Sequence, residues 1–336
     1  MERKGIRNPK LAVIGVGAYF RMIFPGIHIS FDVIATIDKG DYSEEPGGLR
    51  DYVRSFAPDA VMILTPNEFH ASHIEEISEL ELPVFVEKPL VTTATALMRV
   101  LHVVDRHPTL YCSDFYIDVW GSPLTKWWGL PVAPQVDRAI QIIDEKSPLW
   151  TAGKNQIGRV QEVEATLLEG TGAAGSFTGR EWLWDPIHGG VLWDMGYHHL
   201  VMWFTLFNES LEVLSVLKTR VPDAPEGGAE TYGEVLMVSA SGIRFRLRTG
   251  KYIESGDDRA FTIKGTHGSV SMQFAEESQL ILNGNQETAL AKISGMPLDL
   301  TAAAFRDYVD SEPTSPHGLS AAINATRLLL EIHAFG

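Results

Sequence analysis

Two ionisable residues lie four positions apart in a mostly apolar stretch of the sequence, VLWDMGYHHLVMWFTLF. They are Asp194 and His198, and residues four apart share one face of a helix. Charged groups in such a helix are costly to bury without partners. A carboxylate beside an imidazole can orient the ring and favour its protonated form, which suits general acid–base chemistry. A hydrogen-bonded pair with a structural role is the alternative.

The same stretch offers half of a metal site, because Asp and His both bind metals. Further ligands are not evident, although His188 and His199 are near in the sequence, and we expect no metal. His199 lies about 100° around the helix from His198, so it is expected to be packed or at an interface. Cys112 is the single cysteine, which excludes an intrachain disulfide and a cysteine-rich zinc site.

A lysine follows a short apolar segment in Glu87-Lys88-Pro89. The segment Pro83–Val86 has the composition of a buried strand, and it would deliver Lys88 to the edge of a sheet. The proline disfavours the helical conformation at Lys88 and permits a cis bond. A solvated Lys-Pro turn is the alternative interpretation of this tripeptide.

Glycines follow another apolar segment, in Gly15-Val-Gly17-Ala-Tyr-Phe20. Glycines between a strand and a helix permit a tight turn and let the backbone approach a pyrophosphate at the helix N-terminus. Phe20 replaces the third glycine of the usual fingerprint. The pattern therefore predicts a dinucleotide site, and a plain glycine turn is the alternative.

Asp38 ends the next apolar segment, 23 residues after Gly15, which is near the roughly 20 expected for the ribose-binding acid. A carboxylate there accepts hydrogen bonds from ribose hydroxyls and repels a 2′-phosphate, so we expect NAD. Lys39 and Arg21 can offset the repulsion, which leaves NADP open. Thr65-Pro66-Asn67, followed by His70, ends a third segment and can line the same crevice. An ordinary loop with Asn67 as a helix cap is the alternative.

Strands and helices must alternate in the first 120 residues to position these groups. The apolar runs are Lys10–Gly15, Val33–Asp38, Ala60–Thr65 and Pro83–Val86. Helical patterns lie between or after them, at Ala18–Ile27, Gly48–Phe56, His70–Leu80 and Thr93–Asp105. This alternation predicts βαβ units and a parallel sheet, in which ligands bind at the carboxyl ends of the strands.

The pattern changes after about residue 120. The Trp- and Pro-rich segment Trp120–Trp150 has no clean alternation. Strands are predicted at Gly158–Glu169, Leu211–Arg220, Glu234–Ala240, Ile243–Gly250, Arg259–Gly265 and Ser269–Phe274. Helices are predicted at Val191–Phe207, Asp299–Asp310 and Gly318–His333. We expect an α/β chain with two domains, residues 1–120 and 121–336, the second built on an antiparallel or mixed sheet. The C-terminal helix is a candidate to pack back on the first domain.

Composition excludes several classes of protein. Of the 336 residues, 45% are hydrophobic and 21% are charged, as in ordinary globular proteins. The formal net charge of −15 disfavours nucleic-acid binding. No apolar run is long enough to span a membrane, and the first apolar segment is too short and glycine-broken for a signal peptide. We therefore expect a cytoplasmic protein that does not bind membranes.

Taken together and in order, these motifs resemble the Gfo/Idh/MocA family of oxidoreductases, named for glucose–fructose oxidoreductase and inositol dehydrogenase. The resemblance rests on the glycine turn, Thr65-Pro-Asn67 with His70, Glu87-Lys88-Pro89, and Gly189-Gly190 leading to Asp194-x-Gly196-x-His198. It implies a Rossmann domain, then an α/β domain with an open, mostly antiparallel sheet that commonly forms dimer or tetramer contacts. It also implies a nicotinamide cofactor and a sugar or cyclitol substrate.

The resemblance implies residue roles as well. Lys88 would contact the substrate oxygen and the nicotinamide region, His198 would be the general acid–base, and Asp194 would hold both in register. The cofactor site would comprise Gly15, Gly17, Ala18, Tyr19, Phe20, Arg21, Asp38, Lys39, Thr65, Pro66, Asn67, His70, Glu87 and Lys88. Phe20 and Val201 depart from the family pattern, and Val201 stands where an aspartate often follows the histidine.

The substrate is less determined than the chemistry. Tyr116, Trp182 and Trp184 are candidates for an aromatic wall against a sugar ring, or else core residues. A ketoreductase for a nucleotide-linked keto-deoxysugar would need a basic patch, for which the candidates are Arg180, Arg244, Arg246, Arg248 and Lys251. Strand alternation explains the β-strand arginines equally well as a solvated face. The same fold also admits a cofactor-binding regulator without turnover and a NAD-dependent glycoside hydrolase.

Overall fold

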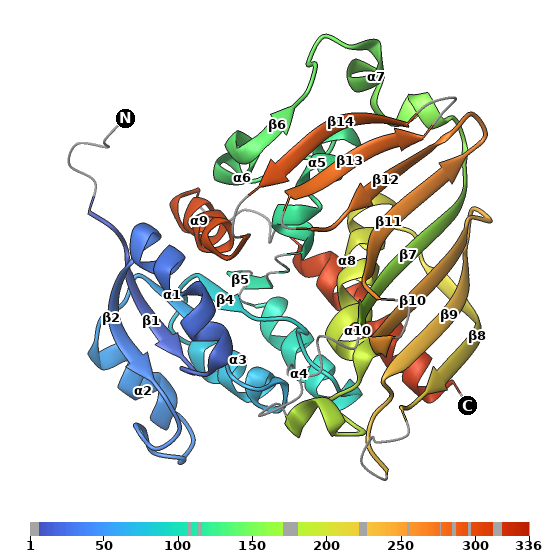
Figure 1. The fold of residues 1–336 in the computed structure, drawn as a ribbon. Helices are drawn as coiled ribbons and strands as arrows, with labels where there is room; N and C mark the ends of the chain where they lie inside the picture. The colour runs from blue at the N-terminus through green and yellow to red at the C-terminus, as the bar shows by residue number, and fades with distance from the viewer. Residues whose placement is uncertain are drawn as a thin grey trace. The chain divides into compact units, whose positions relative to one another are not determined.

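The computed structural model describes residues 7–106, 109–112, 114, 116–170, 181–221, 227–253, 256–275, 277–283, 287–294, 297–311 and 318–335. The chain divides into two compact units (Figure 1). The first comprises Met1–Ser113 with Leu298–Leu319, and the second comprises Asp114–Pro297 with Ser320–Gly336. The division falls seven residues before the expected boundary at 120, and a segment near the chain's end joins the first unit.

The first unit is built, in its described residues, on a five-stranded parallel sheet of order β2-β1-β3-β4-β5. Its strands are β1 (Lys10–Ile14), β2 (Asp32–Ile37), β3 (Ala60–Ile63), β4 (Val84–Val86) and β5 (Leu110–Cys112). Its helices are α1 (Ala18–Ser30), α2 (Gly48–Ser55), the 3₁₀ turn η1 (Asn67–Phe69), α3 (His70–Ser78) and α4 (Ala94–Val104). The predicted parallel sheet is confirmed. The strand order reverses between β1 and β3, and open sheets of this kind generally bind ligands outside the carboxyl ends of the strands at such a point.

Helix α9 (Pro297–Asp310) completes the first unit from the far end of the sequence. Its Phe305 ring lies 5.5 Å from that of Phe31 and 5.4 Å from that of Phe85. Arg306 Nη1 donates to the carbonyl of Ser30 at 2.7 Å. The helix expected to pack back was the last one, whereas the segment that joins the first unit contains α9; nearly all of the last helix, α10 (Leu319–Ala334), belongs to the second unit.

The second unit is built, in the part that the structure describes, on a nine-stranded sheet of order β6-β14-β13-β12-β11-β7-β10-β9-β8. Strands β7 and β10 are parallel and the other neighbours are antiparallel. The strands are β6 (Ile140–Ile142), β7 (Val160–Gly170), β8 (Leu211–Thr219), β9 (Tyr232–Ser239), β10 (Arg244–Ile253), β11 (Asp258–Gly265), β12 (Ser269–Gln273), β13 (Glu277–Asn283) and β14 (Glu287–Ser294). The predicted mixed, mostly antiparallel sheet is confirmed, with β6, β13 and β14 added to it.

Helices cover one face of this sheet, and Figure 1 shows α8 and α10 lying along it. The helical elements are π-helical η2 (Tyr116–Trp120), α5 (Ser122–Trp127), α6 (Pro134–Ala139), α7 (Pro148–Thr151), 3₁₀ η3 (Gly153–Ile157), 3₁₀ η5 (Glu181–Trp184), π-helical η6 (Leu192–Gly196), α8 (Tyr197–Leu206) and α10. Phe245, Leu247 and Thr249 of β10 are buried beneath them. The segment Trp120–Trp150 thus supplies short helices and the edge strand β6.

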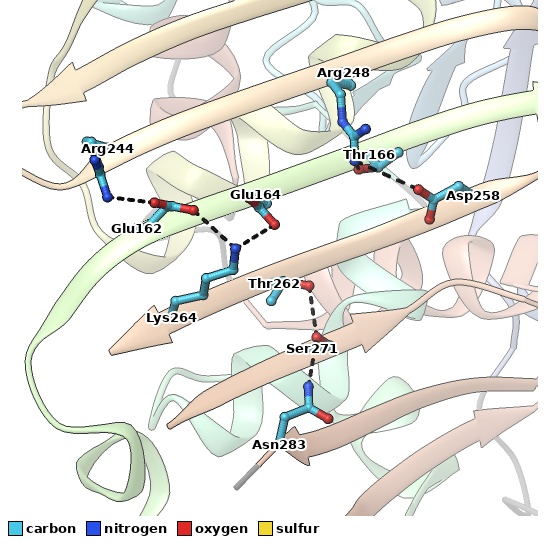
Figure 2. Close-up of polar contacts among 10 residues, drawn as sticks. All are labelled: Glu162, Glu164, Thr166, Arg244, Arg248, Asp258, Thr262, Lys264, Ser271 and Asn283. Carbon is cyan, nitrogen blue, oxygen red and sulfur yellow. Dashed lines mark hydrogen bonds and ion pairs between the residues drawn. The ribbon is translucent and has the colours of Figure 1, made fainter. Parts of the chain in front are cut away.

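The opposite face of the sheet is polar, and ion pairs connect neighbouring strands on it (Figure 2). Arg244 pairs with Glu162 at 2.8 Å, and Lys264 pairs with Glu164 at 2.8 Å. This division into an apolar and a polar face follows from strand alternation, which sends successive side chains to opposite faces. No helix among the described residues is both long and apolar enough to cross a membrane.

Candidate functional site

The glycine turn after β1 is built by close backbone approach. Gly15 has φ +91°, and a Cβ atom there would lie 2.8 Å from the carbonyl carbon of Leu64. Its N–H donates to the carbonyl of Ile37 at 2.8 Å. Only glycine combines this left-handed conformation with such a contact. The turn therefore draws the carboxyl ends of β1, β2 and β3 together.

The start of α1 fits a dinucleotide pyrophosphate. A Cβ atom at Gly17, the residue before the helix, would meet nothing within 4 Å, so the backbone is open to a ligand. No side chain caps the helix, and its first turn has no acidic residue. Uncapped N–H groups at a helix N-terminus bind phosphates. Ala18 and Arg21 of this turn are exposed, and Tyr19 and Phe20 are half-buried.

Two carboxylates follow β2. Asp38 is exposed, and its Oδ1 accepts the N–H of Lys39 at 2.9 Å. Asp41, which the sequence reasoning missed, accepts the N–H of Asp38 on its Oδ2 at 2.8 Å. The only sequence signal for it is the pattern Asp-Lys-Gly-Asp. Two negative charges at this edge suit ribose hydroxyls and oppose a 2′-phosphate.

His73 links the loop after β2 to the loop after β3. Its Nδ1 lies 3.1 Å from Thr65 Oγ1, and its Nε2 lies 3.3 Å from the hydroxyl of Tyr42. Phe69 stacks on the ring with centroids 5.9 Å apart. Burial lowers the pKa of His73 to about 4, so the ring is neutral at pH 7. The imidazole therefore serves as a hydrogen-bonding link between the two loops.

His70 ties the β3 loop to the segment after Lys88. Its Nε2 lies 2.8 Å from the carbonyl oxygen of Thr65, and its Nδ1 lies 3.0 Å from that of Pro89. The ring is fully buried, and burial lowers its pKa. His70 was predicted to be a cofactor residue, and it can contribute to the site by holding the backbone at Thr65 and Pro89 in place. The alternative interpretation, in which Asn67 caps a helix, is wrong, because Asn67 is the first residue of η1 and Pro66 precedes it.

Lys88 lies at the carboxyl end of β4, as the sequence predicts. Lys88 and Glu87 are half-buried, the N–H of Glu87 donates to Ile63 at 3.0 Å, and the Lys88–Pro89 peptide bond is cis. The predicted cofactor residues of the first unit thus follow the carboxyl ends of β1 to β4.

In the second unit, His198 is held by a carboxylate distant in sequence. Its Nδ1 lies 2.7 Å from Oδ1 of Asp114, and the side chains of His198 and Asp114 are 4% and 3% exposed. The sequence had indicated Asp194 as the orienting acid. Asp114 is 84 residues away along the chain, and no pattern in the sequence connects the two.

Asp194 lies on η6, a π-helical turn, and its carboxylate pairs with Lys251 Nζ at 3.1 Å. Lys251 is also 3.5 Å from Glu169, which in turn lies 3.6 Å from Arg259. Lys251 is 4% exposed because it belongs to the helix-covered side of β10. The helix expected over 191–207 is confirmed, with η6 wound as a π-helical turn at its start, and such turns are frequent at functional sites.

The second glycine of the pair before η6 makes room for a half-buried acid. Gly190 has φ +94°, and a Cβ atom there would lie 2.4 Å from Glu230 Oε1. The same oxygen accepts the N–H of Leu192 at 3.0 Å. Burial raises the pKa of Glu230. Gly190 therefore lets the carboxylate of Glu230 reach the start of the helical segment that carries Asp194 and His198.

The remaining predicted residues contribute less to the described site. His199 is fully buried between Phe261 and Phe274, which confirms that it is packed. Tyr116 lies on η2 and Trp182 on η5, but their side chains are outside the described residues, as is Arg180. Nothing in the described residues groups three or more His, Cys, Asp or Glu side chains around a potential metal position.

The arginines of β10 do not form an unpaired basic patch. Arg244 pairs with Glu162, Arg246 pairs with Glu234, and Arg248 donates to Thr166 (Figure 2 for the first and third). They lie on the solvated face, as alternation predicts, whereas Lys251 lies on the opposite face.

A dinucleotide-binding parallel domain followed by an open-sheet α/β domain defines a class of two-domain oxidoreductases. A family model described as "Oxidoreductase family, NAD-binding Rossmann fold" matches residues 30–115. A second, described as "GFO/IDH/MocA C-terminal domain", matches residues 152–271. The chain therefore belongs to the Gfo/Idh/MocA family, and its first domain is an NAD(P)-binding Rossmann domain.

Known relatives are distant. A D-xylose 1-dehydrogenase [NADP(+)] from Haloarcula marismortui is 29% identical over 125 residues, which are 36% of this chain and 31% of that protein. The match thus spans about a third of the curated relative.

Solved structures share the fold over nearly the whole chain. Apo scyllo-inositol dehydrogenase from Lactobacillus casei is 15% identical, with TM-score 0.71, covering 98% of this chain and 96% of that one. A 3-ketoreductase from Actinomadura kijaniata, in complex with NADP and TDP-benzene, is 15% identical, with TM-score 0.69 and 98% of each chain covered. An inositol dehydrogenase homolog from Azotobacter vinelandii, complexed with NAD+, is 14% identical, with TM-score 0.69, covering 98% and 96%.

Proposed function

We propose that this protein catalyses reversible oxidation of a ring hydroxyl of a sugar or cyclitol with a nicotinamide cofactor. The observation that carries the proposal is the buried imidazole of His198, held by a carboxylate at 2.7 Å in a chain that also has an NAD(P)-binding fold. Such an arrangement suits proton transfer to and from a hydroxyl.

The cofactor would lie on the glycine turn, with its pyrophosphate at Gly17 and its adenosine ribose near Asp38. Asp38 and Asp41 favour NAD over NADP, because each would repel a 2′-phosphate. When bound, the nicotinamide supplies a hydride acceptor in oxidation and a hydride donor in reduction.

The side chains divide the remaining chemistry. His198 would take the hydroxyl proton at Nε2 in oxidation and return it in reduction. Lys88 would hydrogen-bond the same substrate oxygen and stabilise the negative charge that develops on it. Asp194, paired with Lys251, would orient the groups around that oxygen.

Support for a sugar or cyclitol comes from the names of the relatives, which include a D-xylose dehydrogenase and a scyllo-inositol dehydrogenase. The cross-strand pairing of Arg244, Arg246 and Arg248 disfavours them as the site for a nucleotide diphosphate. A nucleotide-linked keto-deoxysugar is accordingly the less favoured substrate, and it is tested beside free sugars.

The test is a titration with NADH and NADPH, followed by turnover assays with cyclitols, aldoses and nucleotide-linked keto-sugars. We expect tight NADH binding and turnover of a polyol. Lys88→Met and His198→Gln should each lower kcat by about 10²–10⁴-fold while the Kd for NADH changes little. Lys146→Met, at an exposed position, is the control. Binding without turnover on the whole panel would favour a regulator, and no binding would refute the proposal.

We also propose that the chain forms a homodimer or homotetramer through the polar face of the sheet. Leu217 of β8 and Leu236 of β9 are 53% and 39% exposed, and strand register places both on this face. Light scattering after size exclusion would test it. Leu217→Arg with Leu236→Arg should reduce the mass to that of a monomer, whereas Met98→Arg on α4 should not.

A further inference from the structure

We propose that Asp114 is a positioning residue that fixes the tautomer of His198 and thereby assigns proton transfer to Nε2. The inference deepens the function proposed above, in which His198 is the acid–base group. No sequence motif marks Asp114. Its role differs from that of Asp194, because Asp114 contacts His198 whereas Asp194 pairs with Lys251.

The geometry admits one arrangement of protons when His198 is neutral. An ionised carboxylate only accepts hydrogen bonds, so at 2.7 Å from Asp114 Oδ1 the Nδ1 atom of His198 must carry the hydrogen. The other tautomer would place two lone pairs against each other. Both side chains are at most 4% exposed, so water cannot easily relieve that repulsion.

Asp114 is itself held in place from its own side of the chain. Its N–H donates to Oδ2 of Asp118 at 3.1 Å, and its carbonyl accepts the N–H of Asp118 at 2.7 Å. These two bonds brace the start of η2, on which Asp118 lies. The carboxylate of Asp114 therefore lies on a turn that two hydrogen bonds to Asp118 hold in place, and His198 lies in the first turn of α8.

The charges around the pair support this assignment. Asp194 has Lys251 at 3.1 Å to balance its charge. His199, next to His198, is fully buried, and burial lowers its pKa to about 3. It is therefore neutral at pH 7 and does not compete for the charge of Asp114.

The proton then follows a defined path. With Nδ1–H bonded to Asp114, the neutral ring presents the lone pair of Nε2 as its base. In oxidation the substrate O–H bond breaks, and its proton forms the Nε2–H bond. The resulting imidazolium is stabilised by Asp114, which takes up no proton. In reduction Nε2 returns the proton to the substrate oxygen.

The tautomer can be measured without cofactor or substrate. Long-range ¹H–¹⁵N spectra of the full chain labelled with ¹⁵N-histidine, at a pH where the ring is neutral, distinguish protonated Nδ1 from protonated Nε2. The His198 signals are identified by their loss in His198→Gln. We expect the proton on Nδ1, and on Nε2 in Asp114→Asn, because the amide can turn its NH₂ group toward Nδ1. A proton on Nε2 in the unmodified protein would overturn the proposal even if Asp114→Asn failed to fold.

Kinetics provide the second test. Asp114→Asn should lower kcat by about 10²-fold or more with KM nearly unchanged, and Asp114→Glu should recover part of the loss. Asp144→Asn, an exposed acid of the same unit, should change neither kcat nor the tautomer. Full activity in a folded Asp114→Asn protein would overturn the proposal. Failure of every substrate would instead count against the proposed function, because the NMR result is independent of turnover.

Discussion

Asp194 and Lys251 form an ion pair of 3.1 Å inside the second unit, with side chains that are only 13% and 4% exposed. Lys251 also lies 3.5 Å from Glu169. Lys251 thus balances the charge of two carboxylates, and Arg259 also pairs with Glu169. Removing one partner of a buried pair usually costs more than removing both, because the remaining charge is left uncompensated.

Lys251→Met is therefore expected to lower the free energy of unfolding by about 3 kcal/mol. Urea unfolding at pH 7 measures it. Asp194→Asn in the same background should recover part of the loss, since it removes the uncompensated charge. If the double variant is less stable than Lys251→Met by the full cost of Asp194→Asn alone, the two side chains do not interact.

Gly190→Ala should lower the free energy of unfolding by more than the cost of placing alanine in a left-handed conformation. Alanine in the left-handed region costs roughly 1–2 kcal/mol, and here its Cβ atom would also meet Glu230 at 2.4 Å. Gly242→Ala is the matched control, since Gly242 has φ +85° but open space around its Cβ position. Thermal or urea unfolding should rank Gly190→Ala clearly below Gly242→Ala, and equal losses would show that Glu230 can move aside.

Asp38→Ala should reduce the preference for NADH over NADPH. The variant loses a charged acceptor for the ribose hydroxyls and a charge that opposes a 2′-phosphate, so NADH should bind about tenfold more weakly. Asp41→Asn should raise the affinity for NADPH, and so it should also reduce the preference for NADH. Fluorescence titration with each cofactor measures both effects, and Asp105→Asn at the end of α4 is the control. An unchanged ratio of the two Kd values would refute the assignment.

Stability should fall as the pH is lowered from 7 to 5, and His199 should account for part of the fall. Its pKa is about 3 in the folded chain and near 6.5 when unfolded, so the unfolded state binds more protons over this range. The expected loss is about 2 kcal/mol for this residue. Burial also lowers the pKa of His73 and of His333 to about 4, which acts in the same direction.

His199→Leu isolates the contribution of His199. Between pH 7 and pH 5, the variant should lose less unfolding free energy than the unmodified protein loses. This comparison does not depend on the packing cost of the substitution, which is the same at both pH values. An identical pH dependence in the two proteins would show that His199 binds protons equally in the folded and unfolded states, which contradicts a lowered pKa.

Strands β1 to β4 of the first unit could be predicted because each is a short apolar run that ends at a distinctive residue. Strands β6, β13 and β14 were not predicted. β14 has the sequence ETALAKIS, whose Ala, Leu, Lys and Glu suit a helix as well as a strand, and pairing with β13 decides between them. The helix over 191–207 was predicted, but the π-helical winding of its first part, η6, was not, since helical periodicity does not reveal a π turn.

The sequence by itself determined the parallel domain, the glycine turn at Gly15, the lysine at the end of β4 and the presence of an imidazole on a buried helix. These features depend on the order and spacing of neighbouring residues. Only the tertiary structure decided which charges meet: His198 with Asp114, 84 residues away, and Asp194 with Lys251. Periodicity reports which residues share a face of one element, whereas the pairing of buried charges depends on which elements become neighbours in the folded chain.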